Sequence, residues 1–122
     1  MKITNNKIYS LAEGISQYFE NINTYIPAKA NFYISRNFET IKLMASDIEK
    51  TRVNIMSHYG VISEDGKQYN IPPEDMEQVI KEFNELFEIE HDLEIKTFKL
   101  EDLGHAEFTF PQMQVLEFMI ED

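Results

Sequence analysis

Residues 57–78, SHYGVISEDGKQYNIPPEDMEQ, interrupt a long stretch that otherwise favours helix. Gly60 suits the end of the preceding helix, because glycine adopts positive φ without steric cost. The Asp-Gly pair at 65–66 is typical of a type I′ turn, and apolar or β-favouring residues flank it on both sides. The double proline at 72–73, followed by acidic residues, opens another helix. The stretch therefore predicts a helix, a β-hairpin over 61–71 and a returning helix.

The helix before this stretch is predicted over 28–59, a range without Pro or Gly. Its apolar positions alternate by four and three residues, which is the spacing of a coiled-coil seam. At 1.5 Å per residue the helix is about 48 Å long, so other segments must cover a long stripe. Only one charged residue interrupts the seam. The seam positions are Ile34, Phe38, Ile41, Ala45, Ile48, Arg52, Ile55 and Tyr59.

Two further helices are expected to cover this seam. The returning helix, over 73–90, would be about 28 Å long, so it reaches only the distal part of the long helix. An amphipathic helix over 6–22, with Asn5 or Asn6 as its N-cap, is left to cover the proximal part.

The tail changes period after the returning helix. LEIKTFKL at 93–100 and AEFTF at 106–110 predict short strands within 93–110, and Pro111 opens a short helix over 111–120. The segment Lys2-Ile3-Thr4 is expected to pair with the strand at 93–98. The chain is therefore predicted to be a single domain over 1–122, mainly α with small β: a long antiparallel helical hairpin with a β-hairpin at its tip, short C-terminal strands and a terminal helix.

Composition limits the class of protein. The 122 residues are 43% hydrophobic, enough for a core of their own, and they include no cysteine for a disulfide or a thiolate metal site. No apolar run approaches the roughly 20 residues that span a bilayer, and the start does not resemble a secretory signal. A cytoplasmic protein with no membrane contact is expected.

Charge is divided unevenly along the chain. Residues 1–73 carry eight Lys/Arg and seven Asp/Glu, whereas residues 74–122 carry three Lys and fifteen Asp/Glu, giving formal charges of +1 and −12. A phosphate polyanion would be repelled by the second half, so direct nucleic-acid binding is not expected. The acidic half suits a basic partner surface, or it is simply a solvated face that keeps the protein soluble.

The order of these motifs carries a resemblance. A long helix closing on Tyr59-Gly60 is followed by the acidic Asp-Gly hairpin, then EDMEQVIKEFNELFEIEHDLEI (74–95), KLEDL (99–103) and FTFPQMQVLEFMIED (108–122). Over about residues 28–122 the chain resembles the small prefoldin-like helical-hairpin proteins of bacteriophages, departing from them in Arg52 and the double proline. The resemblance implies a prefoldin-like hairpin without catalytic residues. A phage origin favours proteins that bind a host factor or sequester a small signalling molecule.

No motif indicates an enzyme or a cofactor site. His58, His91 and His105 do not have zinc-ligand spacing, and no metal site is expected. The serines lack a neighbouring base, and acid pairs such as Glu85/Glu88 fit a solvated helix face better than general acid-base catalysis.

Arg52 has two interpretations. In the structural one it extends to solvent or pairs with an acid of the facing helix, such as Glu82 or Glu85, and so fixes register. In the functional one it clasps a phosphate or carboxylate beside the hairpin, where its planar guanidinium suits two-pronged binding. The candidate ligand or partner contacts are Arg52, Tyr59, Lys67, Tyr69, Glu82, Glu85 and Glu88.

The nine Phe and six Tyr exceed what thin helices can cover, which favours homo-oligomerisation through the long helix. The sequence thus leads us to expect a non-enzymatic phage-type interaction protein that counters host machinery. It would be an anti-defence inhibitor that binds a host protein or sequesters a small nucleotide signal. The alternative is a structural or chaperone-like helical-hairpin module in phage assembly.

Overall fold

The computed structural model describes residues 1–121, so Asp122, the last residue of the predicted domain, lies outside it. Helices predominate over small two-stranded sheets, which confirms the mainly α class with small β. The α-helices are α1 (Asn5–Tyr18), α2 (Ala28–Tyr59), α3 (Met76–Phe87) and α4 (Phe110–Leu116). Short 3-10 turns are η1 (Pro73–Asp75), η2 (Leu100–Leu103) and η3 (Glu117–Met119). No helix within 1–121 combines the length and apolarity that crossing a bilayer requires.

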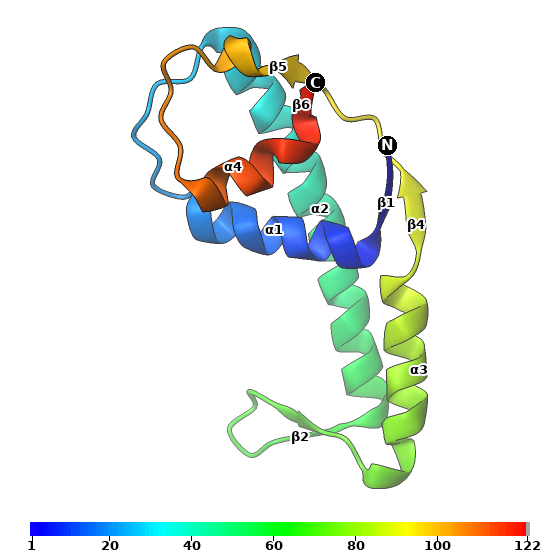
Figure 1. Ribbon diagram of the computed structural model, residues 1–122. Helices are drawn as coiled ribbons and strands as arrows, with labels where there is room; N and C mark the ends of the chain where they lie inside the picture. The colour runs from blue at the N-terminus through cyan, green and yellow to red at the C-terminus, as the bar shows by residue number, and fades with distance from the viewer. Residues whose placement is uncertain (122) are drawn as a thin grey trace.

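The long helix α2 organises the molecule (Figure 1). α1 packs against α2, α4 packs against α1, and α3 returns antiparallel along the end of α2 that leads to the hairpin, with β2 and β3 at the far end. We call residues 49–88, which include the last part of α2 (49–59), the hairpin and α3, the stalk; the remaining described residues form the body. α2 has the same bounds as the helix predicted from the sequence.

Three pairs of short strands join distant segments. β1 (Lys2–Thr4) is antiparallel to β4 (Glu90–Asp92), with Ile3 opposite His91. β2 (Val61–Ile62) is antiparallel to β3 (Tyr69–Asn70), and β5 (Phe98–Lys99) is parallel to β6 (Ile120–Glu121). The first pair ties the start of the chain to the end of the stalk.

The core lies where α1 and α4 meet the first half of α2. α1 and α4 approach so closely that a Cβ on Gly14 would come 2.8 Å from Val115 Cγ2, so glycine is needed there. The buried apolar residues of this core are Ile3, Ile8, Leu11, Ile15, Ala30, Ile34, Phe38, Ile41, Ala45, Ile48, Leu86, Phe98, Leu103, Val115, Leu116 and Met119.

Two buried asparagines attach irregular chain to helices. The Asn37 amide donates to Lys96 O at 2.8 Å and accepts from Lys96 N at 2.9 Å, the two bonds that a neighbouring strand would otherwise make. The Asn5 amide donates to Leu86 O at 2.8 Å, and Asn5 N donates to Ile89 O. Asn5 thereby joins the start of α1 to the backbone at and just after the end of α3.

The helix predicted over 6–22 is shorter than expected and has a different cap. Thr4, rather than Asn5 or Asn6, caps it: the Thr4 hydroxyl accepts from Lys7 N at 3.2 Å. The helix ends at Tyr18 because Phe19 turns to pack edge-on against Phe38, at 4.9 Å between ring centroids. Tertiary packing overrides the remaining apolar spacing.

The strands predicted within 93–110 are largely wrong. Only β5 forms there, and β1 pairs with Glu90–Asp92 instead of 93–98. Asn37 supplies the backbone partner near Lys96 that a strand would have required, and residues 106–109 form a loop in which Glu107 N donates to Thr24 Oγ1. The terminal helix predicted over 111–120 is divided between α4 and η3, and β6 follows it.

The hairpin at 61–71 forms, but its turn is not type I′. A type I′ turn needs positive φ at both central residues, and in the described chain only glycines, Gly66 among them, have positive φ. Gly66 N donates to Ser63 O, and Ser63 N donates to Gln68 O. The loop is therefore longer than the two-residue turn that the Asp-Gly pair predicted. The returning helix predicted over 73–90 is η1 followed by α3, and it stops at Phe87.

Candidate functional site

The seven candidate contact residues all lie in the stalk, but they belong to separate surroundings rather than to one pocket. Arg52 is on α2 close to the body, Tyr59 ends α2, and Lys67 and Tyr69 belong to the hairpin. Glu82, Glu85 and Glu88 lie on or directly after α3. Three environments result: the junction with the body, the hairpin end and the outer face of α3.

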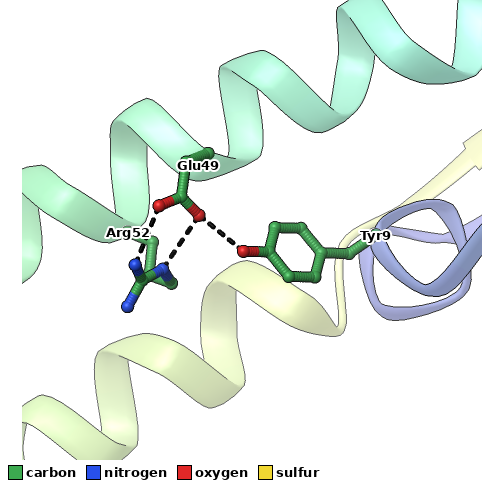
Figure 2. A network of polar contacts seen from close by, with 3 residues as sticks. All are labelled: Tyr9, Glu49 and Arg52. Carbon is green, nitrogen blue, oxygen red and sulfur yellow. Dashed lines mark hydrogen bonds and ion pairs between the residues drawn. The ribbon is translucent and has the colours of Figure 1, made fainter. Parts of the chain in front are cut away.

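At the junction, Arg52 pairs with an acid of its own helix (Figure 2). Arg52 Nε and Nη2 donate to the two carboxylate oxygens of Glu49 at 3.0 and 2.8 Å. The Tyr9 hydroxyl, on α1, donates to the same carboxylate at 2.6 Å. The interpretation in which Arg52 pairs with Glu82 or Glu85 of the facing helix is therefore wrong, because the guanidinium makes its two-pronged bond to Glu49, three residues earlier on its own helix.

These contacts shift the ionisation of all three groups. Hydrogen bonds from Arg52 and then Tyr9 lower the pKa of Glu49 to about 2, against the opposing effect of burial. The Glu49 carboxylate, together with burial, raises the pKa of Tyr9, and the same carboxylate raises the pKa of Arg52. The ions are partly exposed, with 36% and 41% of the Arg52 and Glu49 side chains accessible, so solvent screening keeps the stabilisation modest.

Tyr9 also contacts α3, so one side chain joins all three helices. Its ring packs edge-on against Phe87, with 5.5 Å between centroids. The Tyr9, Glu49 and Arg52 network therefore fixes where the stalk leaves the body. This arrangement is structural: it commits two of the five guanidinium N–H donors to Glu49, whose carboxylate neutralises the arginine charge.

At the hairpin end, Tyr59, Lys67 and Tyr69 do not form a group of cationic side chains that could hold a phosphate or carboxylate. The Glu82 carboxylate, with a smaller effect of burial, raises the pKa of Tyr59, so the end of α2 and the middle of α3 are close enough to interact. Lys67 is exposed on the turn, where its backbone N–H, with the Ser63 hydroxyl, donates to Asp65 and lowers the pKa of that carboxyl. Tyr69 is half-buried on β3.

The outer face of α3 brings the other candidates together. Glu85 and Glu88 border an open, shallow depression of about 760 Å³ that also includes Glu74, Glu77, Gln78, Ile80, Lys81 and Asn84. Glu82 does not line it. The lining belongs to η1, α3 and Glu88 directly after it, so this is an accessible helix face and not an enclosed cavity. Four carboxylates and one ammonium give it a strongly acidic character.

Sequence reasoning missed the apolar part of the stalk surface. Met76 and Ile80 of α3 remain 43% and 51% exposed, as do Val61 and Ile62 of the hairpin at 66% and 54%. The apolar residues of α3 spread over a broad arc of the helix, so they predicted a larger apolar surface than α2 alone could cover. The Tyr9 and Glu49 contact had no equivalent sign, since 40 residues separate the two.

The histidines do not assemble a metal centre. His58 packs edge-on against Tyr59, and His91 shares a 2.7 Å hydrogen bond with the Asn5 amide oxygen. Within the described part of the chain, no three side chains of His, Asp or Glu gather as metal ligands would.

Comparisons with protein-family models, with curated proteins and with solved structures found no match to this chain.

Proposed function

We propose that this protein is a non-enzymatic protein-binding module whose stalk occupies a basic surface on another protein. The outer face of η1 and α3 carries the proposal. It presents Glu74, Glu77, Glu85 and Glu88 around Ile80, on a segment that projects from the body (Figure 1). An acidic rim around exposed apolar area suits a partner with lysine or arginine around an apolar spot, and charge complementarity would speed association.

The resemblance to prefoldin-like phage proteins supports a further part of the proposal. The hairpin of α2 and α3 would be of that type, and the partner would be a host protein, most plausibly of a defence system. In this role the stalk would inhibit the host protein by covering a basic surface that normally binds another acidic ligand.

Sequestration of a small nucleotide has less support from the site. Arg52 is bonded to Glu49 at both prongs, and the broadest stalk face is acidic, which repels phosphate. A panel of cyclic and ADP-ribose-type nucleotides tests this mode, because a ligand that binds the folded state raises the melting temperature. We expect no shift.

The experiment on protein binding uses charge reversal. Immobilised wild-type protein and the Glu85→Lys/Glu88→Lys variant are incubated with a bacterial lysate, and retained proteins are identified by mass spectrometry. We expect a protein with a basic surface to be retained by the wild type and lost by the variant. With the purified pair, rising salt should slow association.

A matched control carries the same change of charge on the body, as Glu13→Lys/Glu107→Lys, both at exposed positions. It should retain the partner. A partner lost from the body variant but kept by the stalk variant would contradict the proposal.

One observation favours the alternative of a chaperone-like module. The apolar side chains of Val61 and Ile62 are exposed at the hairpin, as a client-gripping tip would require. Suppression of aggregation of a chemically unfolded client protein tests it. Under this alternative Val61→Ser/Ile62→Ser abolishes suppression, whereas Glu85→Lys/Glu88→Lys does not.

A further inference from the structure

A second surface, in the body, combines exposed apolar side chains with a groove. The groove has a volume of about 450 Å³ and lies between α4 and the chain that follows β5. In Figure 1 both elements are in the upper part of the molecule, whereas the stalk extends below. The lining residues are Leu100, Phe110, Met113, Gln114, Glu117 and Ile120.

The sequence of α4 explains why this face is open. Phe110, Met113, Gln114 and Glu117 follow i, i+3, i+4 and i+7 spacing, which places them on one helix face. The opposite face carries Val115 and Leu116, which are buried in the core, as is Met119 of η3. The helix therefore commits its other face to packing and leaves this one without a partner in the described chain.

The exposure is large for residues of this kind. Phe110 is 76% exposed and Leu100 is 59% exposed, and they border the same groove. Single exposed apolar residues are ordinary, but a group of them around a groove marks an interaction site. The groove also falls within the roughly 300–1,000 Å³ typical of ligand sites.

Charge indicates the occupant. Glu117 lines the groove, and Glu101 and Glu121 lie beside Leu100 in an adjoining depression whose only cation is Lys99. Glu121 is held in position by the Thr97 hydroxyl, which donates to its carboxylate at 2.7 Å. Carboxylates thus outnumber the ammonium at this edge, and an incoming chain with basic side chains would be attracted.

We propose that this groove binds a segment of a partner protein in which apolar anchor residues are flanked by lysine or arginine. The anchor enters between Phe110, Met113 and Leu100, and the flanking cations face Glu117, Glu101 and Glu121. A second copy of this chain fits less well, because the net charge of −11 and two acidic rims would oppose each other. The site is separate from the stalk and does not depend on the function proposed for it.

Binding is measured by fluorescence anisotropy with a short fluorescein-labelled peptide in which adjacent Phe and Leu are flanked by lysines. We expect saturable binding with a dissociation constant below about 1 mM. Phe110→Ser and, separately, Leu100→Ser should each weaken it by about tenfold, since buried aromatic and aliphatic anchors dominate such contacts. Because both side chains are exposed, the melting temperature should barely change.

The control is Phe32→Ser, which removes an aromatic residue that is 61% exposed on α2 and lines no part of this groove. It should bind the peptide as the wild type does, as should Glu85→Lys/Glu88→Lys. A peptide with glutamates in place of the lysines should not bind.

Three results would overturn the proposal: no binding of the lysine-flanked peptide, equal binding of the glutamate-flanked one, or equal loss in Phe32→Ser or the stalk variant. Sedimentation of the free protein adds a fourth. A dimer that Phe110→Ser converts to monomer would assign the groove to a second copy instead.

Discussion

α2 has a longer part in the body (28–48) and a shorter part in the stalk (49–59), with the same apolar spacing but very different surroundings. In the body part, Ile34, Ile41 and Ile48 are at most 4% exposed, because they belong to the core cluster with residues of α1, α4 and β5. In the stalk part, Ile55 and Tyr59 are only half-buried, since α3 covers one side of the helix. The burial of the seam residues therefore depends on how many elements pack against each part of the helix.

The part of α2 that stabilises the fold is therefore different from the part whose apolar side chains are accessible to a partner. The body part belongs to the core cluster, whereas the stalk leaves Val53, Met76 and Ile80 at its surface. Segments with few buried apolar contacts open at lower free energy and are the ones that adapt to partners. We therefore propose that partner binding belongs to the stalk, which contributes less to the stability of the fold.

The largest expected effect tests this division directly. Ile41→Ala removes a side chain with 0% exposure and should lower the free energy of unfolding by about 2–5 kcal/mol. Ile55→Ala, at the half-buried position, should cost about 1 kcal/mol because solvent already reaches the site. Urea denaturation followed by circular dichroism measures both. Equal losses of unfolding free energy would show that the body part and the stalk part of α2 contribute equally to stability.

The next effect concerns how the body holds irregular chain. Asn37→Ala removes both hydrogen bonds to Lys96 and leaves its backbone groups without their partner, at a cost of about 1–3 kcal/mol. Asn31→Ala, at an exposed position of the same helix, is the matched control and should be nearly neutral. Chemical denaturation of the two variants gives the comparison. If Asn31→Ala costs as much, the loss does not come from the bonds to Lys96.

A smaller effect on stability is expected where the stalk joins the body. The folded pKa of Glu49 is about 2, below its ordinary value of 4.5. A depressed carboxyl pKa stabilises the folded state above the unfolded pKa, and this contribution is lost as pH falls from about 4.5 towards 2. Because 41% of the Glu49 side chain is exposed, we expect a contribution of no more than about 1 kcal/mol.

Glu49→Gln tests it, since the amide cannot ionise. The free energy of unfolding of the wild type should fall more steeply than that of the variant between pH 4.5 and 2, measured by urea denaturation at each pH. Parallel curves would mean that Glu49 is not linked to folding. Tyr9→Phe should lessen the dependence partly, because it removes one of the three hydrogen bonds that lower the pKa.

The smallest effect is expected on the outer stalk. Ile80→Gln replaces a side chain that is 51% exposed and should change the free energy of unfolding by less than about 0.5 kcal/mol. The same substitution should weaken partner binding clearly, since Ile80 lies among the carboxylates of the proposed contact. Thermal unfolding together with the binding assay separates the two. A large loss of stability would mean that Ile80 packs in the fold and is not available to a partner.

Local patterns predicted some elements well and others poorly. The bounds of α2 follow from an uninterrupted seam between Pro27 and Gly60, and the hairpin follows from the Asp-Gly pair and the β-favouring residues that flank it. The expectation of positive φ at Gly60 is wrong, since its backbone is extended with a φ of −98°. The strands within 93–110 failed because Asn37, distant in sequence, takes the place of a strand partner. Arg52 was recognised as unusual, but its partner Glu49 was missed, because the arginine was expected to reach across to the facing helix.

By itself, the sequence determined the helical periods, the reversal between α2 and α3 and the acidity of the second half, because these depend on residues that are close together along the chain. Only the tertiary structure decided which seam positions are buried, how Tyr9 joins three helices, and which apolar faces of α3 and α4 stay open. The reason is physical: periodicity shows that a face needs a partner, but the partner's identity depends on segments that meet only when the chain is folded.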